Sequence, residues 1–294
     1  MADTRSVVIT GASRGLGLAS AVELYRRGWC VVGAMRSSEA GLARIRELTG
    51  APADDARLVG VPLDLTDPES VKQAAETIVA TVGAPYAVVN NAGVSSLGFV
   101  EETPDDVWQQ VFATNLFGPV SLTKALLPSM RAAGRGRIVM VSSQSGVFGM
   151  PSAAAYSAVK AALERWAESL AAEISPFGIG VSILVTGMHD TDIIDDRALG
   201  YPDYRDWDGV YGKQHGPLDV RGHKALKFAR SPDKFARALA KALDGDTGPF
   251  VRRAVGIDAL MLMIGARLLP SRALYQVCRL FLGQPRHNSL KPKP

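Results

Sequence analysis

The sequence predicts a doubly wound α/β fold, in which helices cover both faces of a parallel sheet and a helical extension follows. Short apolar runs rich in β-branched residues alternate with segments of helical length as far as about residue 185. A glycine-rich turn joins the first run to the first helical pattern. The chain has 294 residues, 47% of them apolar and 21% charged, so it can bury a core. Helical crossovers between parallel strands place helices on both faces of the sheet.

Six strands are predicted from apolar runs, each bounded by polar or glycine-containing segments. In chain order these strands are Val7–Thr10, Val31–Ala34, Leu58–Pro62, Ala87–Asn90, Arg137–Ser142 and Gly180–Val185.

Helices are predicted between these runs from apolar residues that recur every three or four positions. A further helix is predicted to start at Ser231-Pro232-Asp233, a favourable N-terminal signal, and to end at Gly245. Examples of the apolar spacing are Leu18, Val22 and Tyr25, then Val71, Ala75 and Ile78, and finally Phe235, Leu239 and Leu243.

A stretch at about residues 189–225 is rich in aspartate and aromatic residues. A loop of this length inside a domain is usually functional or mobile, so it is either a solvated surface insertion or a substrate lid. We assign residues 1–250 to a single dinucleotide-binding domain and residues 251–294 to a C-terminal helical extension.

Composition argues against several classes of protein. The formal charge of +4 is not gathered into one long basic run, which disfavours nucleic-acid binding. Cys30 and Cys278 are far apart and predict free thiols in a reducing compartment. The spacing of His189, His215 and His223 matches no metal-binding template. From this spacing we expect no metal site. No signal peptide precedes the first strand, so we expect a cytoplasmic protein.

The turn from Thr10 to Gly17 places three glycines between the first strand and the first helix. Gly11, Gly15 and Gly17 allow a tight turn and close approach of the backbone to a pyrophosphate at the helix N-terminus. Three glycines at such a spacing arise easily by chance, and the position between strand and helix gives the motif its weight.

The order of several motifs resembles that of the short-chain dehydrogenase/reductase family. Gly-x-x-x-Gly-x-Gly at residues 11–17 is followed by Asp64, Asn90-Asn91-Ala92-Gly93, Asn115, Ser143 and Tyr156-x-x-x-Lys160. The resemblance covers residues 5–191 and continues more loosely to about residue 250. It implies a Rossmann-like sheet, a nicotinamide dinucleotide, hydride transfer and assembly as a homodimer or homotetramer.

Tyr156 and Lys160 are one helical turn apart, so both lie on one face of a helix. A nearby cation favours the phenolate and lowers the pKa of a tyrosine. The resemblance implies that Tyr156 is the catalytic acid or base, and that Lys160 binds the nicotinamide ribose. It further implies that Ser143 binds the developing alkoxide and that Asn115 holds a relay water.

Two of these assignments have alternatives. Ser142 and Ser145 are neighbours of Ser143 and compete for its role, although the 13-residue offset to Tyr156 matches the family at Ser143. Asn115 could instead mark a helix kink or a buried amide with all its hydrogen bonds made.

NADP(H) is expected in preference to NAD(H). Family members specific for NAD carry an acid at the end of the second strand, where this chain has Met35 followed by Arg36. Arg36 and Arg14 together offer two guanidinium groups for a 2′-phosphate, although both could simply face solvent. The residues implied as cofactor contacts are Gly11, Ser13, Arg14, Gly15, Leu16, Gly17, Arg36, Asp64, Leu65, Asn90, Gly93, Tyr156, Lys160 and Thr191. Thr186 replaces the usual family proline, which could loosen the loop that carries Thr191.

Apolar segments point to a small lipophilic ketone, aldehyde or alcohol as substrate. In this family the segments 95–99 and 147–151 border the reacting carbon, and neither contains a charge. Residues 259–282 mix apolar helical faces with arginines. We favour packing or a subunit contact for them, with an anionic membrane surface as the alternative.

The predicted function is NADP(H)-dependent interconversion of a carbonyl and an alcohol. One alternative is a non-catalytic NADP(H)-binding regulator, which would have no use for Ser143, Tyr156 and Lys160 together. Another is a sugar-nucleotide epimerase or dehydratase, which the glycine spacing and the short C-terminal region disfavour.

Overall fold

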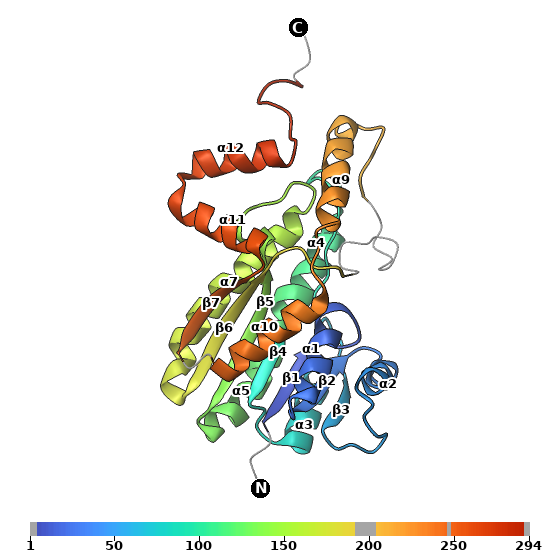
Figure 1. Ribbon diagram of the computed structural model, residues 1–294, viewed down its shortest axis with the longest axis vertical. Helices are drawn as coiled ribbons and strands as arrows, with labels where there is room; N and C mark the ends of the chain where they lie inside the picture. Colours follow the sequence, from blue (N-terminus) through green and yellow to red (C-terminus); the bar gives the residue numbers. More distant parts are fainter. Residues whose placement is uncertain (1–4, 192–203, 246–247, 291–294) are drawn as a thin grey trace.

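Seven parallel strands form one sheet in the computed structural model, which describes residues 5–191, 204–245 and 248–290. The strand order is β3-β2-β1-β4-β5-β6-β7 (Figure 1). From the central pair β1 and β4 the chain winds outward in opposite directions, and such a switch point leaves a crevice at the carboxyl ends of the strands. The strands are β1 (Ser6–Thr10), β2 (Cys30–Met35), β3 (Leu58–Pro62), β4 (Ala87–Asn90), β5 (Gly136–Ser143), β6 (Ile179–Thr186) and β7 (Phe250–Val255).

Helices cover both faces of this sheet. One apolar core joins it to α3, α5 and α7, and a second core joins it to α1, α2 and α10. The helices are α1 (Gly15–Arg26), α2 (Ser38–Thr49), α3 (Pro68–Val82), α4 (Asp105–Phe112), α5 (Gly118–Ala133), α6 (Gln144–Val147), α7 (Ala154–Ile174), α9 (Gly212–Leu226), α10 (Pro232–Gly245), α11 (Ile257–Leu268) and α12 (Ser271–Phe281). A π-helical turn, η1 (Ala113–Phe117), joins α4 to α5, and a 3₁₀ turn, η2 (Ser175–Phe177), follows α7.

Successive side chains of a strand point to opposite faces of the sheet, so an all-apolar strand makes both faces of the sheet apolar. In β1, Val8 belongs to the core under α3, α5 and α7, whereas Val7 and Ile9 belong to the opposite core. All five residues of β1 are buried, as expected for a central parallel strand covered on both sides.

All six predicted strands are present, each within one residue of its expected ends. The seventh, Phe250–Val255, was not predicted. It is an edge strand that pairs with β6 alone, and only Val255 in it is buried, so it lacks an apolar run. The sheet therefore extends past the expected domain boundary at residue 250, and the helical extension begins with α11.

The loop expected at about residues 189–225 is only partly described, since residues 192–203 lie outside the described residues. Its second half contains α9, a helix that was not predicted. This half packs on the segment after β4: the Tyr204 amide donates to the Leu97 carbonyl at 3.2 Å, and His215 Nε2 lies 2.7 Å from Glu102 Oε1. Within the described part of the chain, no helix is long and apolar enough to cross a bilayer.

Candidate active site

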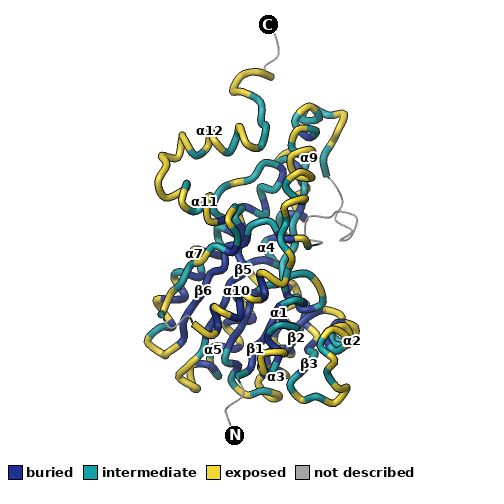
Figure 2. The backbone as a smooth tube through the Cα atoms, viewed as in Figure 1, coloured by how far each residue is buried: buried dark blue, intermediate teal, exposed yellow. Residues whose placement is uncertain are grey.

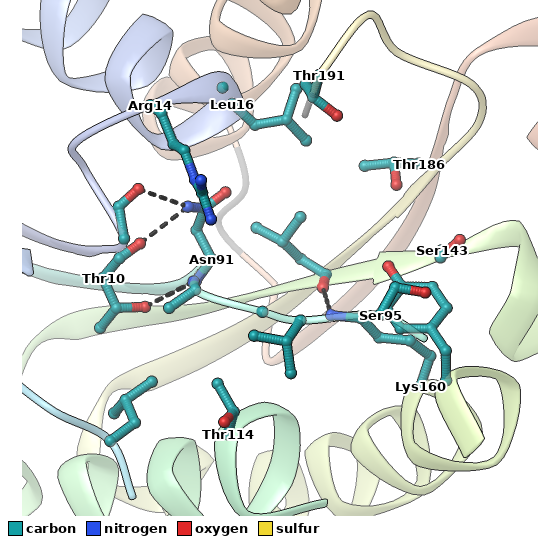
Figure 3. A pocket seen from close by; sticks show the side chains of 18 of the residues that line it. Thr10, Arg14, Leu16, Asn91, Ser95, Thr114, Ser143, Lys160, Thr186 and Thr191 are labelled. Atoms are coloured by element: carbon teal, nitrogen blue, oxygen red, sulfur yellow. Dashed lines mark hydrogen bonds between the residues drawn. The ribbon is translucent and has the colours of Figure 1, made fainter. Parts of the chain in front are cut away.

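A cavity of about 610 Å³ lies at the carboxyl ends of the strands, over the switch point between β1 and β4. Figure 3 shows Arg14, Leu16 and Thr191 on one side of it and Ser143 and Lys160 on the other. Most of the predicted site residues line this cavity; the three that do not are Gly17, Asn90 and Asn115.

The glycine-rich turn forms one wall of the cavity. Gly11 adopts a φ of +68°, in the left-handed region that a glycine adopts without strain. Gly17 is buried behind the wall, where a Cβ atom would lie 2.2 Å from the Gly11 carbonyl oxygen and 2.6 Å from Asn91 Nδ2. Asn91 Nδ2 also donates to the Thr10 carbonyl at 2.8 Å, so this side chain ties the turn to the end of β4. Gly17 therefore shapes the turn without facing the ligand space.

Gly17→Ala is expected to lower the free energy of unfolding by about 1–3 kcal/mol, because its methyl group overpacks a backbone contact. The turn must shift to make room, so dinucleotide affinity falls as well. Urea unfolding and fluorescence titration with NADPH measure the two effects. Gly222→Ala is the matched control, because a Cβ there meets nothing within 4 Å. Equal unfolding energies for Gly17→Ala and wild type would refute this account of the turn.

Two arginines mark the end of the cavity next to β2. Arg14 and Arg36 are exposed, line the cavity and have no ion-pair partner among the described residues. Met35 is buried, and its Sδ would lie 2.2 Å from a Cβ at Gly41, so it fills the core beneath α2. No acid stands at the end of β2.

Asp64 is the single carboxylate among the described residues that line the cavity. Its Oδ1 accepts hydrogen bonds from the Thr66 amide at 2.9 Å and from the Thr66 hydroxyl at 2.7 Å. These bonds hold the pKa of Asp64 below its usual range; burial opposes them, and the charge of Arg36 adds a smaller lowering. Asp64 is thus oriented by its own loop.

Ser143, Tyr156 and Lys160 meet at the other end of the cavity. Ser143 ends β5 and caps α6, where its Oγ accepts from the Ser145 amide at 3.2 Å. Tyr156 lies close enough to Ser143 for the serine hydroxyl to lower the pKa of its phenol. Lys160 follows one turn later on α7; its Nζ lies 5.5 Å from the Tyr156 ring centroid and donates to the Val141 carbonyl at 2.9 Å.

The expected lowering of the Tyr156 pKa is not found. Burial raises the pKa of Tyr156 to about 12, and the hydrogen bond with Ser143 opposes this only in part. The Lys160 ammonium is engaged by the Val141 carbonyl and is itself buried, which lowers its pKa to about 8 despite the charge of Glu164. One helical turn brings the lysine to the tyrosine ring, but it does not by itself acidify the phenol.

The structure separates the competing serines. Ser142 also lines the cavity, but its buried hydroxyl donates to Glu164 Oε1 at 2.6 Å and is therefore already engaged. Glu164 also binds the guanidinium of Arg252, with Nε at 2.8 Å. Ser143 and Ser145 both line the cavity, and of the two only Ser143 contributes to the pKa of Tyr156. The sequence analysis did not predict that Glu164 belongs to this site. Its position four residues after Lys160 on the same helix could have indicated it.

Comparison with known proteins is consistent with this geometry. Residues 5–200 match the family described as short chain dehydrogenase. The chain belongs to that family. This short-chain dehydrogenase is 33% identical to the uncharacterized oxidoreductase YbbO of Escherichia coli (strain K12) over 274 residues, which cover 93% of each chain.

Two further proteins are similar over nearly the whole length. The chain is 31% identical to the 3-ketodihydrosphingosine reductase of Bacteroides thetaiotaomicron, covering 94% of this chain and 97% of that one. The crystal structure of a short-chain dehydrogenase from Streptomyces avermitilis superposes with a TM-score of 0.78 at 33% identity, covering 97% and 100% of the two chains.

Asn115 of this short-chain dehydrogenase lies in the π-helical turn η1 and does not line the cavity. Its Nδ2 donates to the Val94 carbonyl at 2.9 Å and the Val111 carbonyl at 2.7 Å, and its Oδ1 accepts from the Val94 amide at 3.2 Å. The alternative reading, a buried amide with its bonds made at a helix irregularity, therefore describes its geometry. A relay role for Asn115 stays a prediction.

Asn90 and Thr191, two further residues predicted to contact the cofactor, differ in whether they line the cavity. Asn90 is buried behind the cavity, where its Nδ2 lies 3.3 Å from Thr123 Oγ1; its neighbour Asn91, which was not singled out, lines the cavity instead. Thr191 lines the cavity and faces Gly15, with its Cγ2 3.4 Å from where a Cβ would stand. The Thr186 hydroxyl donates to the Ser142 carbonyl at 2.8 Å and so fastens the end of β6 to β5.

Proposed function

We propose that this short-chain dehydrogenase interconverts a carbonyl and an alcohol on a small lipophilic molecule, with NADP(H) as the hydride carrier. The observation that carries the proposal is that one cavity holds Ser143, Tyr156 and Lys160 at one end and, at the other, two arginines that form no ion pair with a described residue. Bound there, the nicotinamide would supply or accept the hydride.

The protein side chains would handle the proton and the developing charge. A tyrosine with a pKa near 12 is protonated at neutral pH, so in the reductive direction the Tyr156 hydroxyl can donate its proton to the carbonyl oxygen. The Ser143 hydroxyl would donate a hydrogen bond to the same oxygen as its negative charge grows. The Lys160 ammonium, close to the ring, would stabilise the phenolate left behind.

The preference for NADP(H) is proposed from the charges beside β2. A 2′-phosphate carries negative charge that guanidinium groups bind through paired, charge-assisted hydrogen bonds. Arg14 and Arg36 border the cavity there and form no ion pair with a described residue, and the buried Met35 offers no carboxylate to ribose hydroxyls.

Arg36→Asp is expected to change the ratio of kcat/KM for NADPH to kcat/KM for NADH by about 10- to 100-fold in favour of NADH. The change removes one charge-assisted contact worth about 1.5–3 kcal/mol and adds repulsion. Steady-state kinetics with both cofactors measure it. Arg44→Asp is the control, since Arg44 is exposed on α2 and does not line the cavity. An unchanged ratio in Arg36→Asp would defeat the NADP(H) assignment.

A lipophilic substrate is proposed from the lining near Tyr156. Apart from the buried Lys160, the described residues at this end carry no charge, and they include Val94, Leu97 and Met188. The relative named 3-ketodihydrosphingosine reductase supports a ketone on a long-chain molecule. A panel of alkyl ketones, aldehydes and secondary alcohols should show kcat/KM rising with chain length, whereas a preference for phosphorylated or carboxylated sugars would overturn this substrate class.

A further inference from the structure

Helix α11 leaves an apolar stripe open to solvent along its whole length. Five apolar residues on one side of the helix are between 42% and 73% exposed, namely Ile257, Leu260, Met261, Ile264 and Leu268. Their spacing of three and four residues places them in one line, on the face where a helix at a protein surface normally carries polar side chains. Figure 2 shows the exposed positions along α11 and the neighbouring α12.

Helix α12 continues this surface. Val277, Leu280 and Phe281 are 56%, 63% and 75% exposed, and Arg272 and Arg279 follow another side of the helix. Both helices lie beyond the carboxyl ends of the strands and stand out from the body of the molecule in Figure 1. We call the exposed apolar residues of α11 and α12 the extension face.

The charged residues that follow Asp258 in the sequence all have one sign. After Asp258 the sequence contains no acidic residue, whereas Lys and Arg occur at six positions: Arg267, Arg272, Arg279, Arg286, Lys291 and Lys293. Asp258 itself is occupied, because its carboxylate accepts from Arg230 at 2.8 Å and from the Met188 amide at 2.6 Å. Arg267 and Arg272 are exposed and have no ion-pair partner in the part of the chain that the structure describes. In α11 after Asp258 and throughout α12, every charged side chain is therefore cationic.

We propose that the extension face docks the protein on an anionic lipid bilayer. Apolar side chains of an amphipathic helix enter the boundary between headgroups and acyl chains, and flanking cations are attracted to anionic headgroups. A second copy of the chain fits this surface less well. In a two-fold contact the same patch meets itself, and a patch without a free carboxylate offers its arginines no acidic partner.

The extension face is joined to the rim of the cavity. Helix α11 packs on α6, the short helix that Ser143 caps. At its first turn Asp258 holds the backbone of Met188, which lines the cavity. A bilayer bound by α11 and α12 would thus lie at the same end of the sheet as the cavity. The docking itself does not depend on the proposed oxidoreductase function.

Flotation of the full-length protein with lipid vesicles tests the proposal. One vesicle set is phosphatidylcholine, and the other contains about 30% phosphatidylglycerol. We expect the wild-type protein to float with the anionic vesicles at least about tenfold more strongly than with the neutral ones, and to be released by high salt. The double variant Met261→Glu/Ile264→Glu and the double variant Arg267→Glu/Arg272→Glu should each lose the bound fraction.

Matched controls keep the result specific. Leu48→Glu places the same charge at a helical leucine that is 46% exposed on α2, and Arg44→Glu reverses a charge on that helix. Both should float like wild type, and circular dichroism should show that all variants are folded. The proposal is overturned if wild type does not float, if it floats equally with neutral vesicles, or if the controls lose binding as the test variants do. It is also overturned if sedimentation velocity shows a dimer that Met261→Glu/Ile264→Glu dissociates, because a second copy then covers the face.

Discussion

Tyr156→Phe is expected to lower kcat by about 10²- to 10⁴-fold, the range that a positioned general acid contributes. The substitution removes one oxygen and leaves the ring, so the cavity keeps its shape and NADPH affinity should stay within a few-fold of wild type. The loss falls on kcat because the phenol proton is needed only when charge develops on the substrate oxygen.

Ketone reduction followed at the NADPH absorbance, together with calorimetric titration of NADPH, separates chemistry from binding. Tyr275→Phe is a suitable control because it removes a phenol hydroxyl from the exposed helix α12, outside the cavity. Turnover by Tyr156→Phe close to the wild-type rate would remove this residue from the mechanism. Tight NADPH binding by a wild-type protein that turns over no member of the substrate panel would instead favour the non-catalytic regulator.

Lys160→Met is expected to lower kcat by about 10²-fold or more, comparable to the loss of one preorganised electrostatic group. The same change should stabilise the fold at neutral pH. Burial lowers the pKa of Lys160 from 10.5 to about 8, so keeping the ammonium charged below that pH costs on the order of 3 kcal/mol. The lost hydrogen bond to the Val141 carbonyl offsets part of the gain.

The lowered pKa of Lys160 determines how the stability difference between Lys160→Met and wild type changes with pH. Between about pH 8 and pH 10.5 the unfolded chain binds the Lys160 proton while the folded chain has released it, so wild-type stability gains from rising pH in this window. The variant lacks this contribution. Urea unfolding should therefore show the stability advantage of Lys160→Met shrinking from about pH 7 to about pH 10. A constant difference over that range would contradict the lowered pKa.

The sheet could be predicted because each central strand is an unbroken apolar run that needs no information from elsewhere in the chain. Edge strand β7 escaped prediction for the opposite reason, since Arg252 and Arg253 interrupt Phe250–Val255 and only one residue of the strand is buried. Helix α9 was also missed, because its sequence contains Gly216, Pro217 and Gly222, which usually mark loops.

The candidate site could be predicted where its residues are close in the chain. The glycine turn is contiguous, and Tyr156 and Lys160 are four residues apart. Contacts between residues distant in the chain could not be predicted from the sequence. Glu164 and Arg252, for example, are 88 positions apart. The hydrogen bond from Lys160 to the Val141 carbonyl likewise depends on how α7 packs on β5. The direction of the Tyr156 pKa shift depends on burial as well as on neighbouring charge, which spacing alone does not report.

A crystal structure of the complex with NADPH tests the account most directly. The account predicts the 2′-phosphate between Arg14 and Arg36, the pyrophosphate on the glycine turn at the start of α1, and the nicotinamide ring beside the Tyr156 hydroxyl and Ser143. A nicotinamide ring directed away from Tyr156, or a 2′-phosphate that neither arginine contacts, would contradict it.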